Sequence, residues 1–277
     1  GNVTNMNLMF FSASSFTGDI SNWNVSSVTD MSYMFYVALA FNGDLSNWNV
    51  SSVTNMDAMF AYASSFNGDI SNWNVSSVSI ISYMFLNASS FNGDISNWNV
   101  SSVTNMNGMF YKALAFNQDI SSWNVSSVLY MRGMFQDSGL STPNYDALLN
   151  GWSTQTVQQG VTFDANGIAY CDGVDARQDL IDTYGWTITD GGLDCSTAGI
   201  EDENLLTISL YPNPAKDKLF IQGLSKPSKV SIYNVLGKLV FSKTTSSEVD
   251  LEGLQTGVYI VKIRDQQKET TRKFIKS

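Results

Sequence analysis

The sequence predicts a mainly β protein with short helices: a solenoid of repeated coils with an α/β cap, followed by a small β-sandwich. Three observations predict this organisation. A 25-residue pattern recurs along the first half, two helical stretches then interrupt it, and the last quarter of the chain alternates polar and apolar residues. We therefore expect a solenoid at 1–140, its cap at 141–195, a linker at 196–205 and a separate domain at 206–277.

Composition excludes several classes of function. Residues 1–200 carry 16 acidic and 3 basic residues, a net charge of −13, which argues against nucleic-acid binding. The 277 residues contain no His, so histidine-based catalytic triads and imidazole metal sites are excluded. No apolar run is long enough for a membrane helix, so we expect no membrane span.

The repeat is defined by aromatic and acidic columns with a period of 25 residues. Stacked coils would bury these aromatic columns as one core, because a single unit cannot cover its own apolar edge. The columns are Phe16, Phe41, Phe66, Phe91 and Phe116; Asp19, Asp44, Asp69, Asp94 and Asp119; Trp23, Trp48, Trp73, Trp98 and Trp123; and Phe35, Phe60, Phe85, Phe110 and Phe135.

Each unit predicts a strand, a turn and a helical segment. The spacing of Ile20, Trp23 and Val25 predicts a short strand with Trp23 and Val25 pointing inward. The i, i+3, i+4, i+7 stripe at 31, 34, 35 and 38 predicts a short amphipathic helix. Residues 1–10 match the second half of a unit, so we expect the chain to begin inside a repeat, which leaves the lack of a signal peptide uninformative.

The unit, in forms such as FNGDISNWNVSSVTNMNGMF, closely resembles the BspA-like repeat of bacterial surface proteins, a relative of the leucine-rich repeats. The resemblance covers about residues 1–195. It implies a leucine-rich-repeat-like solenoid displayed outside the cell, in a family generally without assigned catalytic residues.

The cap is predicted from the segment where the period breaks. A helix should start at Thr142 and Pro143, a strand should lie in VTFDANGIAYC, a second helix should end at Gly185, and WTITDGG should form the last strand. Cys171 and Cys195 both fall here; we expect a disulfide, with two buried thiols as the alternative. Asp164, Asp172, Asp175 and Asp190 are read as a solvated acidic surface rather than paired catalytic acids.

The last domain contains seven short alternating segments, which predict a small Ig-like β-sandwich. They are LTISLY, KLFIQ, KVSIYNV, KLVFSK, EVDL, GVYIVKIRD and KETTRKFIK. Pro212 and Pro214 are expected before the first turn rather than inside the sheet. The side chains expected to point inward are Val230, Ile232, Val235, Tyr259, Val261 and Ile263.

Four stretches in this domain, YPNPAKDKL, SIYNVLGKLV, LQTGVYIVKI and the terminal KFIKS, closely resemble the type A C-terminal sorting domain of the type IX secretion system of Bacteroidetes. The resemblance implies passage through the periplasm, recognition by an outer-membrane translocon and shuttle protein, and removal by a sortase-like protease that cuts in the upstream linker. The recognition candidates it gives are Pro212, Asn213, Pro214, Gly237, Gly257, Tyr259 and Lys273. Each of them has an alternative reading as a turn or core residue.

Two further columns on the solenoid are candidate ligand sites. The Asp column is expected to accept hydrogen bonds from backbone N–H groups, with calcium bridging as the alternative. The outward amides are expected to form a stabilising ladder, with a glycan or protein ligand as the alternative; the Trp column is expected to fill the core rather than bind sugars. The outward amides are Asn22, Asn24, Asn47, Asn49, Asn72, Asn74, Asn97, Asn99 and Asn124.

The sequence thus predicts a secreted or cell-surface repeat protein of the adhesion or interaction class, without catalysis and without a cofactor. The alternative is a spacer or carbohydrate-binding part of a larger secreted carbohydrate-active enzyme. A calcium-dependent binding module is a further alternative.

Overall fold

The computed structural model describes residues 2–195, 208–224, 226–234, 238–265 and 268–277. The chain divides into two compact units, Gly1–Ala198 and Gly199–Ser277. The expected linker at 196–205, together with Val235 and Gly237, lies outside the described residues. The architecture is mainly β, with two short helices among the described residues.

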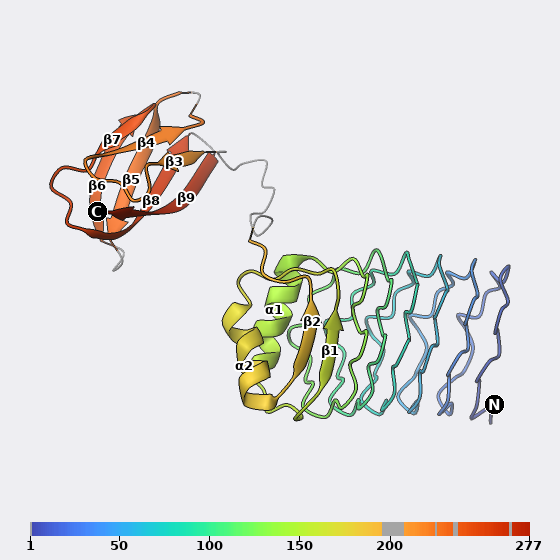
Figure 1. Ribbon diagram of the computed structural model, residues 1–277. Helices are drawn as coiled ribbons and strands as arrows, with labels where there is room; N and C mark the ends of the chain where they lie inside the picture. Colours follow the sequence, from blue (N-terminus) through green and yellow to red (C-terminus); the bar gives the residue numbers. More distant parts are fainter. Residues whose placement is uncertain (1, 196–207, 225, 235–237, 266–267) are drawn as a thin grey trace. The chain divides into compact units, whose positions relative to one another are not determined.

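The first unit is a stack of coils joined by parallel backbone contacts (Figure 1). Isolated bridges link residues 25 positions apart, from Asn5 through Asp30, Asn55, Ile80 and Asn105 to Tyr130. Along one stretch of each coil, alternate residues donate backbone N–H groups to the next coil. Met31 donates to the carbonyl of Asn55 at 3.0 Å and Phe35 to that of Met59 at 2.9 Å. The 25-residue period of the sequence is therefore the length of one coil.

The prediction of a short helix in each repeat is wrong. Across residues 2–141 the structure forms successive turns, in which residues four apart, such as Tyr33 and Val37, are left-handed with φ of 56° and 57°. An α-helix about 10 Å wide cannot fit into a stack whose backbones hydrogen-bond to their neighbours about 4.8 Å away. The apolar stripe that suggested a helix is still buried, because the turns bring Met34 and Phe35 inward.

The strand predicted around each tryptophan is also absent from the described coils. The inward direction is confirmed, since Trp48 and Val50 are buried whereas Asn47 and Asn49 are exposed. From Trp48 onward, each indole of the column is bonded to the coil before it, as where Trp73 Nε1 donates to the carbonyl of Leu45 at 3.0 Å. This bond links neighbouring coils at the place where the hydrogen bonds of a strand ladder would otherwise link them.

Columns of stacked rings form the core of the stack. Successive rings lie 5.8 Å apart in the column of Phe60 and Phe85 and 6.4 Å apart in the column of Trp73 and Trp98, with planes within 4° of parallel. Burial of such large rings is the main favourable term in folding. The predicted role of the tryptophans as core residues is confirmed.

The cap closes one end of the stack (Figure 1). It consists of α1 (Thr142–Ser153), β1 (Thr162–Ala165), α2 (Val174–Tyr184) and β2 (Thr187–Asp190), with β1 and β2 parallel. Both helices lie where the sequence predicts them, and Gly185 ends α2 in a left-handed conformation. The last coil bonds to β1, where Phe135 donates to the carbonyl of Asp164 at 3.0 Å.

The second unit contains the predicted seven strands in two antiparallel sheets. Sheet order is β3-β4-β7 and β6-β5-β8-β9, and one buried cluster includes residues from both. Pro212 and Pro214, each preceded by a cis peptide bond, lie between β3 and β4, outside the strands. The strands are β3 (Ser209–Tyr211), β4 (Lys218–Gln222), β5 (Ser228–Asn234), β6 (Leu239–Thr245), β7 (Glu248–Asp250), β8 (Gly257–Asp265) and β9 (Lys268–Lys276).

The inward residues predicted for the central strands are confirmed where the structure describes them. Val230 and Ile232 of β5 and Val261 and Ile263 of β8 are fully buried, and Tyr259 is 8% exposed. The alternation of a half-buried sheet therefore predicted these positions correctly.

Candidate functional site

The outward amides of the coils occupy one exposed face, but they do not form the ladder that the sequence suggested. The second Asn of each unit accepts hydrogen bonds within its own coil, as Asn74 Oδ1 does from the Ser76 N–H at 3.2 Å and hydroxyl at 2.7 Å. The side chain of Asn72 remains exposed. These oxygens are therefore partly used for local turns.

A different amide column links the coils, and sequence reasoning missed it. An Asn follows each of Phe41, Phe66, Phe91 and Phe116, and its Oδ1 accepts the N–H of the equivalent Asn in the next coil. The series Asn42, Asn67, Asn92 and Asn117 is held by bonds of 2.8 Å. The cap continues it, because the Ser141 N–H donates to Asn117 Oδ1 at 2.9 Å. The signal was the Asn of the FNGD and FNQD segments, recurring at the same period as Phe.

The Asp column makes the turn hydrogen bonds that the sequence predicts. Asp69 Oδ1 accepts from the Ser71 N–H at 2.9 Å and from its hydroxyl at 2.7 Å. The hydroxyl of Ser71 is the largest cause that lowers the pKa of Asp69 below its ordinary value, and the Ser71 N–H is the second. Desolvation and the charge of Asp94 oppose this effect. The pKa values of Asp19, Asp44 and Asp94 are lowered in the same way by serine two residues on.

Among the described residues, no group of three or more His, Cys, Asp or Glu side chains is placed to hold a metal ion. The Asp column supplies one carboxylate per coil, and each carboxylate accepts a hydrogen bond from the serine two residues on. Nor does the part of the chain that the structure describes hold a helix long and apolar enough to cross a membrane.

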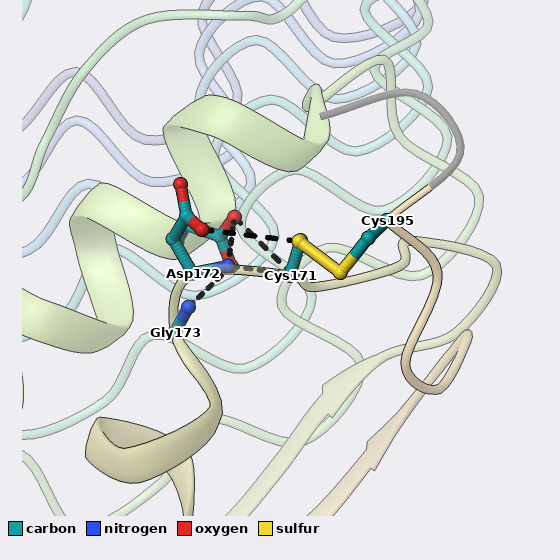
Figure 2. The surroundings of a disulfide bond; sticks show 5 residues. Cys171, Asp172, Gly173 and Cys195 are labelled. Atoms are coloured by element: carbon teal, nitrogen blue, oxygen red, sulfur yellow. Dashed lines mark hydrogen bonds between the residues drawn. A yellow bond between two sulfur atoms is a disulfide. The ribbon is translucent and has the colours of Figure 1, made fainter. Parts of the chain in front are cut away.

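The cap holds a disulfide between Cys171 and Cys195, whose Cα atoms lie 4.9 Å apart (Figure 2). Beside it, the carboxylate of Asp146 is buried and accepts N–H bonds of 2.9 Å from Cys171, Asp172 and Gly173. Asp146 thus joins α1 to the segment that begins α2. Sequence reasoning missed it because its partners lie at least 25 residues away.

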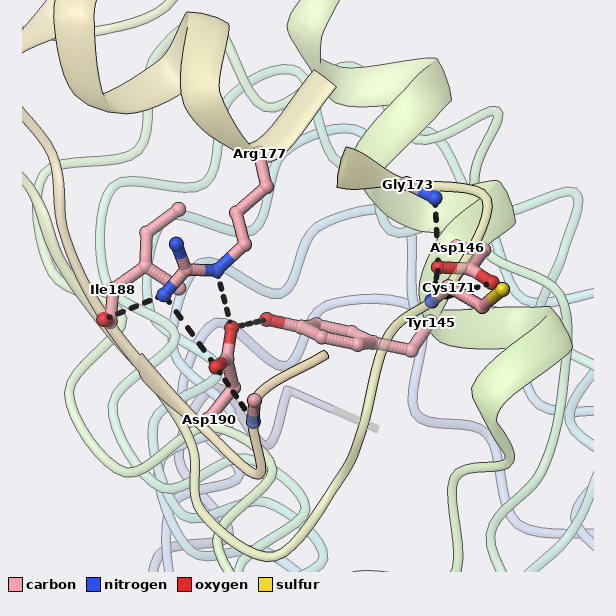
Figure 3. Close-up of polar contacts among 8 residues, drawn as sticks. Tyr145, Asp146, Cys171, Gly173, Arg177, Ile188 and Asp190 are labelled. Carbon is pink, nitrogen blue, oxygen red and sulfur yellow. Dashed lines mark hydrogen bonds and ion pairs between the residues drawn. The ribbon is translucent and has the colours of Figure 1, made fainter. Parts of the chain in front are cut away.

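The acidic residues of the cap do not form one solvated surface as expected. The side chain of Asp190 is 3% exposed, pairs with Arg177 at 2.6 Å and accepts from the Tyr145 hydroxyl at 3.1 Å (Figure 3). The pKa of Tyr145 is raised well above its ordinary value. Burial is the largest cause, and the charge of Asp190 is the second. Asp172 and Asp175 are exposed, so the expectation holds for them but is wrong for Asp190.

A shallow hollow of about 410 Å³ lies where the last coil meets the cap. Tyr130 is 56% exposed there and Leu129 46%, and Arg132 and Asn107 supply polar groups. Arg132 is one of three basic residues in the first 200. The hollow therefore combines an exposed ring, an amide and a cation.

The recognition candidates that the structure describes differ in exposure. Pro212, Asn213, Pro214 and Lys273 are exposed and Gly257 is half-buried, whereas Tyr259 is buried. Tyr259 stacks on Phe274 with ring centroids 5.7 Å apart and donates its hydroxyl to the carbonyl of Gln255 at 2.9 Å.

The structure also brings the PNPA segment against the C-terminal strand. Asn213 Oδ1 accepts the N–H of Ile275 at 2.8 Å, and the carbonyl of Ile275 accepts the N–H of Ala215 at 2.7 Å. Gly257 pairs with Lys276 at the same end of β9. The motifs near the two ends of this domain are therefore adjacent in space.

Comparison with known families gives two matches that divide the chain in the same way. The model described as Mycoplasma protein of unknown function, DUF285, matches residues 1–89 and 65–166. The model described as secretion system C-terminal sorting domain matches residues 209–277. Neither is a family of enzymes. The second match marks the chain for type IX export to the cell surface or beyond it.

No curated protein matches. A solved structure of PorZ, described as a bacterial surface component of the type-IX secretion system of Porphyromonas gingivalis, matches at 25% identity and a TM-score of 0.25. The match covers 28% of this chain and 12% of that one.

Proposed function

From the premise that this chain belongs to the DUF285 repeat family and carries a type IX sorting domain at residues 209–277, we propose that it is a non-catalytic adhesion or interaction scaffold outside the cell. The coils would form a solenoid of leucine-rich-repeat type, and the last domain an Ig-like sandwich. The single observation that supports the scaffold most is the stack itself, whose large side chains are used for packing between coils.

The exposed surface supports an interaction role. Rows of amides recur once per coil, and repeated weak contacts add avidity to any extended ligand. The hollow around Tyr130 and Arg132, where the last coil meets the cap, offers an exposed ring and a cation to a ligand. A glycan or a protein on the outer face of the coils is the proposed ligand.

Export is proposed to proceed from the periplasm through the outer-membrane translocon, with a shuttle protein and a sortase that read residues 206–277. The exposure of Pro212, Asn213, Pro214 and Lys273 supports their role as contact residues. The burial of Tyr259 instead supports a role in shaping the domain.

The export role is tested by deleting residues 206–277 in cells that possess a type IX system. The first unit has its own buried core, which contains no residue of the deleted domain, so the truncated protein should fold. We expect it to accumulate in the periplasm, while the full chain reaches the medium or the cell surface. Equal external amounts of the two proteins would contradict the export role.

The interaction role is tested on the purified first unit with a glycan array. Replacement of Asn74 and Asn99 by Ala should abolish any binding that uses the amide face, whereas Arg132→Ala should abolish binding that uses the hollow. Absence of binding to glycans and to host or bacterial surface proteins would contradict the adhesion role.

A further inference from the structure

The four sheet edges of the second unit are not protected equally. Strands β3 and β7 are three residues long, and the pairing of β6 with β5 is interrupted by a register shift between Ile232 and Tyr233. Strand β9 pairs with β8 without interruption over nine residues. Short strands and bulges are two of the devices by which proteins protect sheet edges, and β9 is the edge that has neither.

The backbone groups at this edge can be assigned from the alternation of an antiparallel ladder. Ile275 uses both its N–H and its carbonyl on the side away from β8, where they bond to Asn213 and Ala215. Lys273 and Thr271, two and four residues earlier, therefore also direct their backbone groups outward. The Thr271 carbonyl accepts from the Arg272 guanidinium at 2.9 Å, which leaves the Thr271 N–H and both groups of Lys273 facing outward.

The PNPA segment covers only the end of this edge. Ala215 forms a parallel bridge with Lys276, so the residues before Ala215 run back toward Lys273. Pro214 and Pro212 have no N–H and cannot extend the ladder in that direction. The segment thus ends the covered part of β9, and among the described residues none bonds to the backbone groups of Lys273 or to the Thr271 N–H, so the stretch at Thr271–Lys273 is open to them.

We propose that this open edge of β9 accepts an extended, acidic segment of the export machinery as an additional strand. The proposal rests on the proposed export function and names its contact surface. Main-chain hydrogen bonds would supply the binding free energy, as in other cases of strand addition. Residues 270–277 contain Arg272, Lys273 and Lys276 and no acidic residue, so acidic side chains on the added strand complement them.

A second copy of this chain fits the edge less well. Two β9 strands paired antiparallel about Arg272 would place the two guanidinium groups opposite each other, and like charges opposite each other destabilise a sheet. The occupant is therefore a strand of a different chain.

The test uses full-length chains in cells with the export system. Thr271→Pro removes the outward N–H and blocks the approach of a strand, and Pro is tolerated on an edge strand at such a position. Thr271→Ala is the matched control, because it changes the side chain and keeps the N–H. We expect Thr271→Pro to reduce external protein at least about tenfold, equivalent to about 1.4 kcal/mol, and Thr271→Ala to leave it unchanged.

A second measurement keeps the proposal testable if Thr271→Pro does not fold. A photo-crosslinking amino acid at position 273 should trap a component of the machinery, and one at Val240 on β6 should not. Normal export of a folded Thr271→Pro variant, crosslinks from 240 but not from 273, or crosslinks only to a second copy would overturn the proposal. If export stops on deletion of 206–277 while Thr271→Pro exports normally, the export function stands and the strand-addition site is wrong.

Discussion

The backbone N–H of Asn92 donates to Oδ1 of Asn67, its equivalent in the preceding coil, at 2.8 Å. The bond links neighbouring coils beside the buried Phe66 and Phe91, and the side-chain oxygen takes the place of a backbone carbonyl. Exposed polar residues thus contribute to the stacking of the coils, alongside the buried rings.

Removing one member of this amide column should weaken the stack. Asn67→Ala leaves the Asn92 N–H without its acceptor, and we expect the free energy of unfolding to fall by about 1 kcal/mol. Asn67→Asp keeps an oxygen acceptor and should cost less. Urea denaturation measures both, with the exposed Asn72→Ala as control; an equal effect of Asn67→Ala and Asn72→Ala would contradict the role of the column.

Gly108→Ala should destabilise the protein because of Tyr83. A Cβ at 108 would lie 2.5 Å from Cδ1 and Cε1 of the Tyr83 ring, in a residue with φ of 57°. We expect a loss of more than about 2 kcal/mol, since the left-handed conformation alone costs about 1–2 kcal/mol. Gly160→Ala, with φ of 68° and no atom within 4 Å, should show the backbone cost alone.

The clash can be separated from the backbone effect by a double variant. Thermal unfolding of Tyr83→Ala/Gly108→Ala should show that Gly108→Ala costs less in the absence of the ring. An unchanged cost would mean that the ring does not limit the site.

The lowered pKa of Asp69 should depend on Ser71. Ser71→Ala removes the hydroxyl bond, the largest cause of the shift, so the pKa of Asp69 should rise toward its ordinary value. Because the folded-state pKa is depressed, this carboxylate stabilises the fold above its unfolded pKa, and the contribution is lost as the pH falls through the folded pKa. Carboxyl NMR titration of the two proteins measures the change; identical titration curves would contradict it.

Asp146 should be essential for the cap. Asp146→Asn turns an amide N–H₂ toward the N–H groups of residues 171–173, and we expect a loss of about 3 kcal/mol. The exposed Asp172→Asn is the matched control and should change the free energy of unfolding by less than about 0.5 kcal/mol. Comparable losses in the two variants, measured by denaturant unfolding, would show that the buried contacts are not the cause.

Calcium should not stabilise the coils. Each Asp of the column is bonded to the serine two residues on, as at Asp94 and Ser96. We expect the melting temperature to be the same in millimolar calcium and in a chelator, because only a ligand that binds the folded state raises it. A rise on adding calcium would favour the calcium-dependent binding module instead.

How far the sequence could be interpreted depended on how local each signal is. The 25-residue period identified the columns of Trp48 and Phe60 as core, because an apolar residue at a fixed position in each unit has no other way to be buried. The start of α1 and the end of α2 could be predicted equally well, since Pro143 and Gly185 act within a few residues of these helix ends.

Contacts between coils decided the backbone conformation of each repeat and the long-range hydrogen bonds. The spacing of Met31, Met34 and Phe35 is the same for a helix and for turns with a left-handed residue every fourth position, and only the N–H bonds to the next coil select the turns. The amide column and the position of Asp146 join residues about 25 apart in the sequence. Such bonds form only once the backbone has placed both partners, so the tertiary structure, and not the local pattern, determines them.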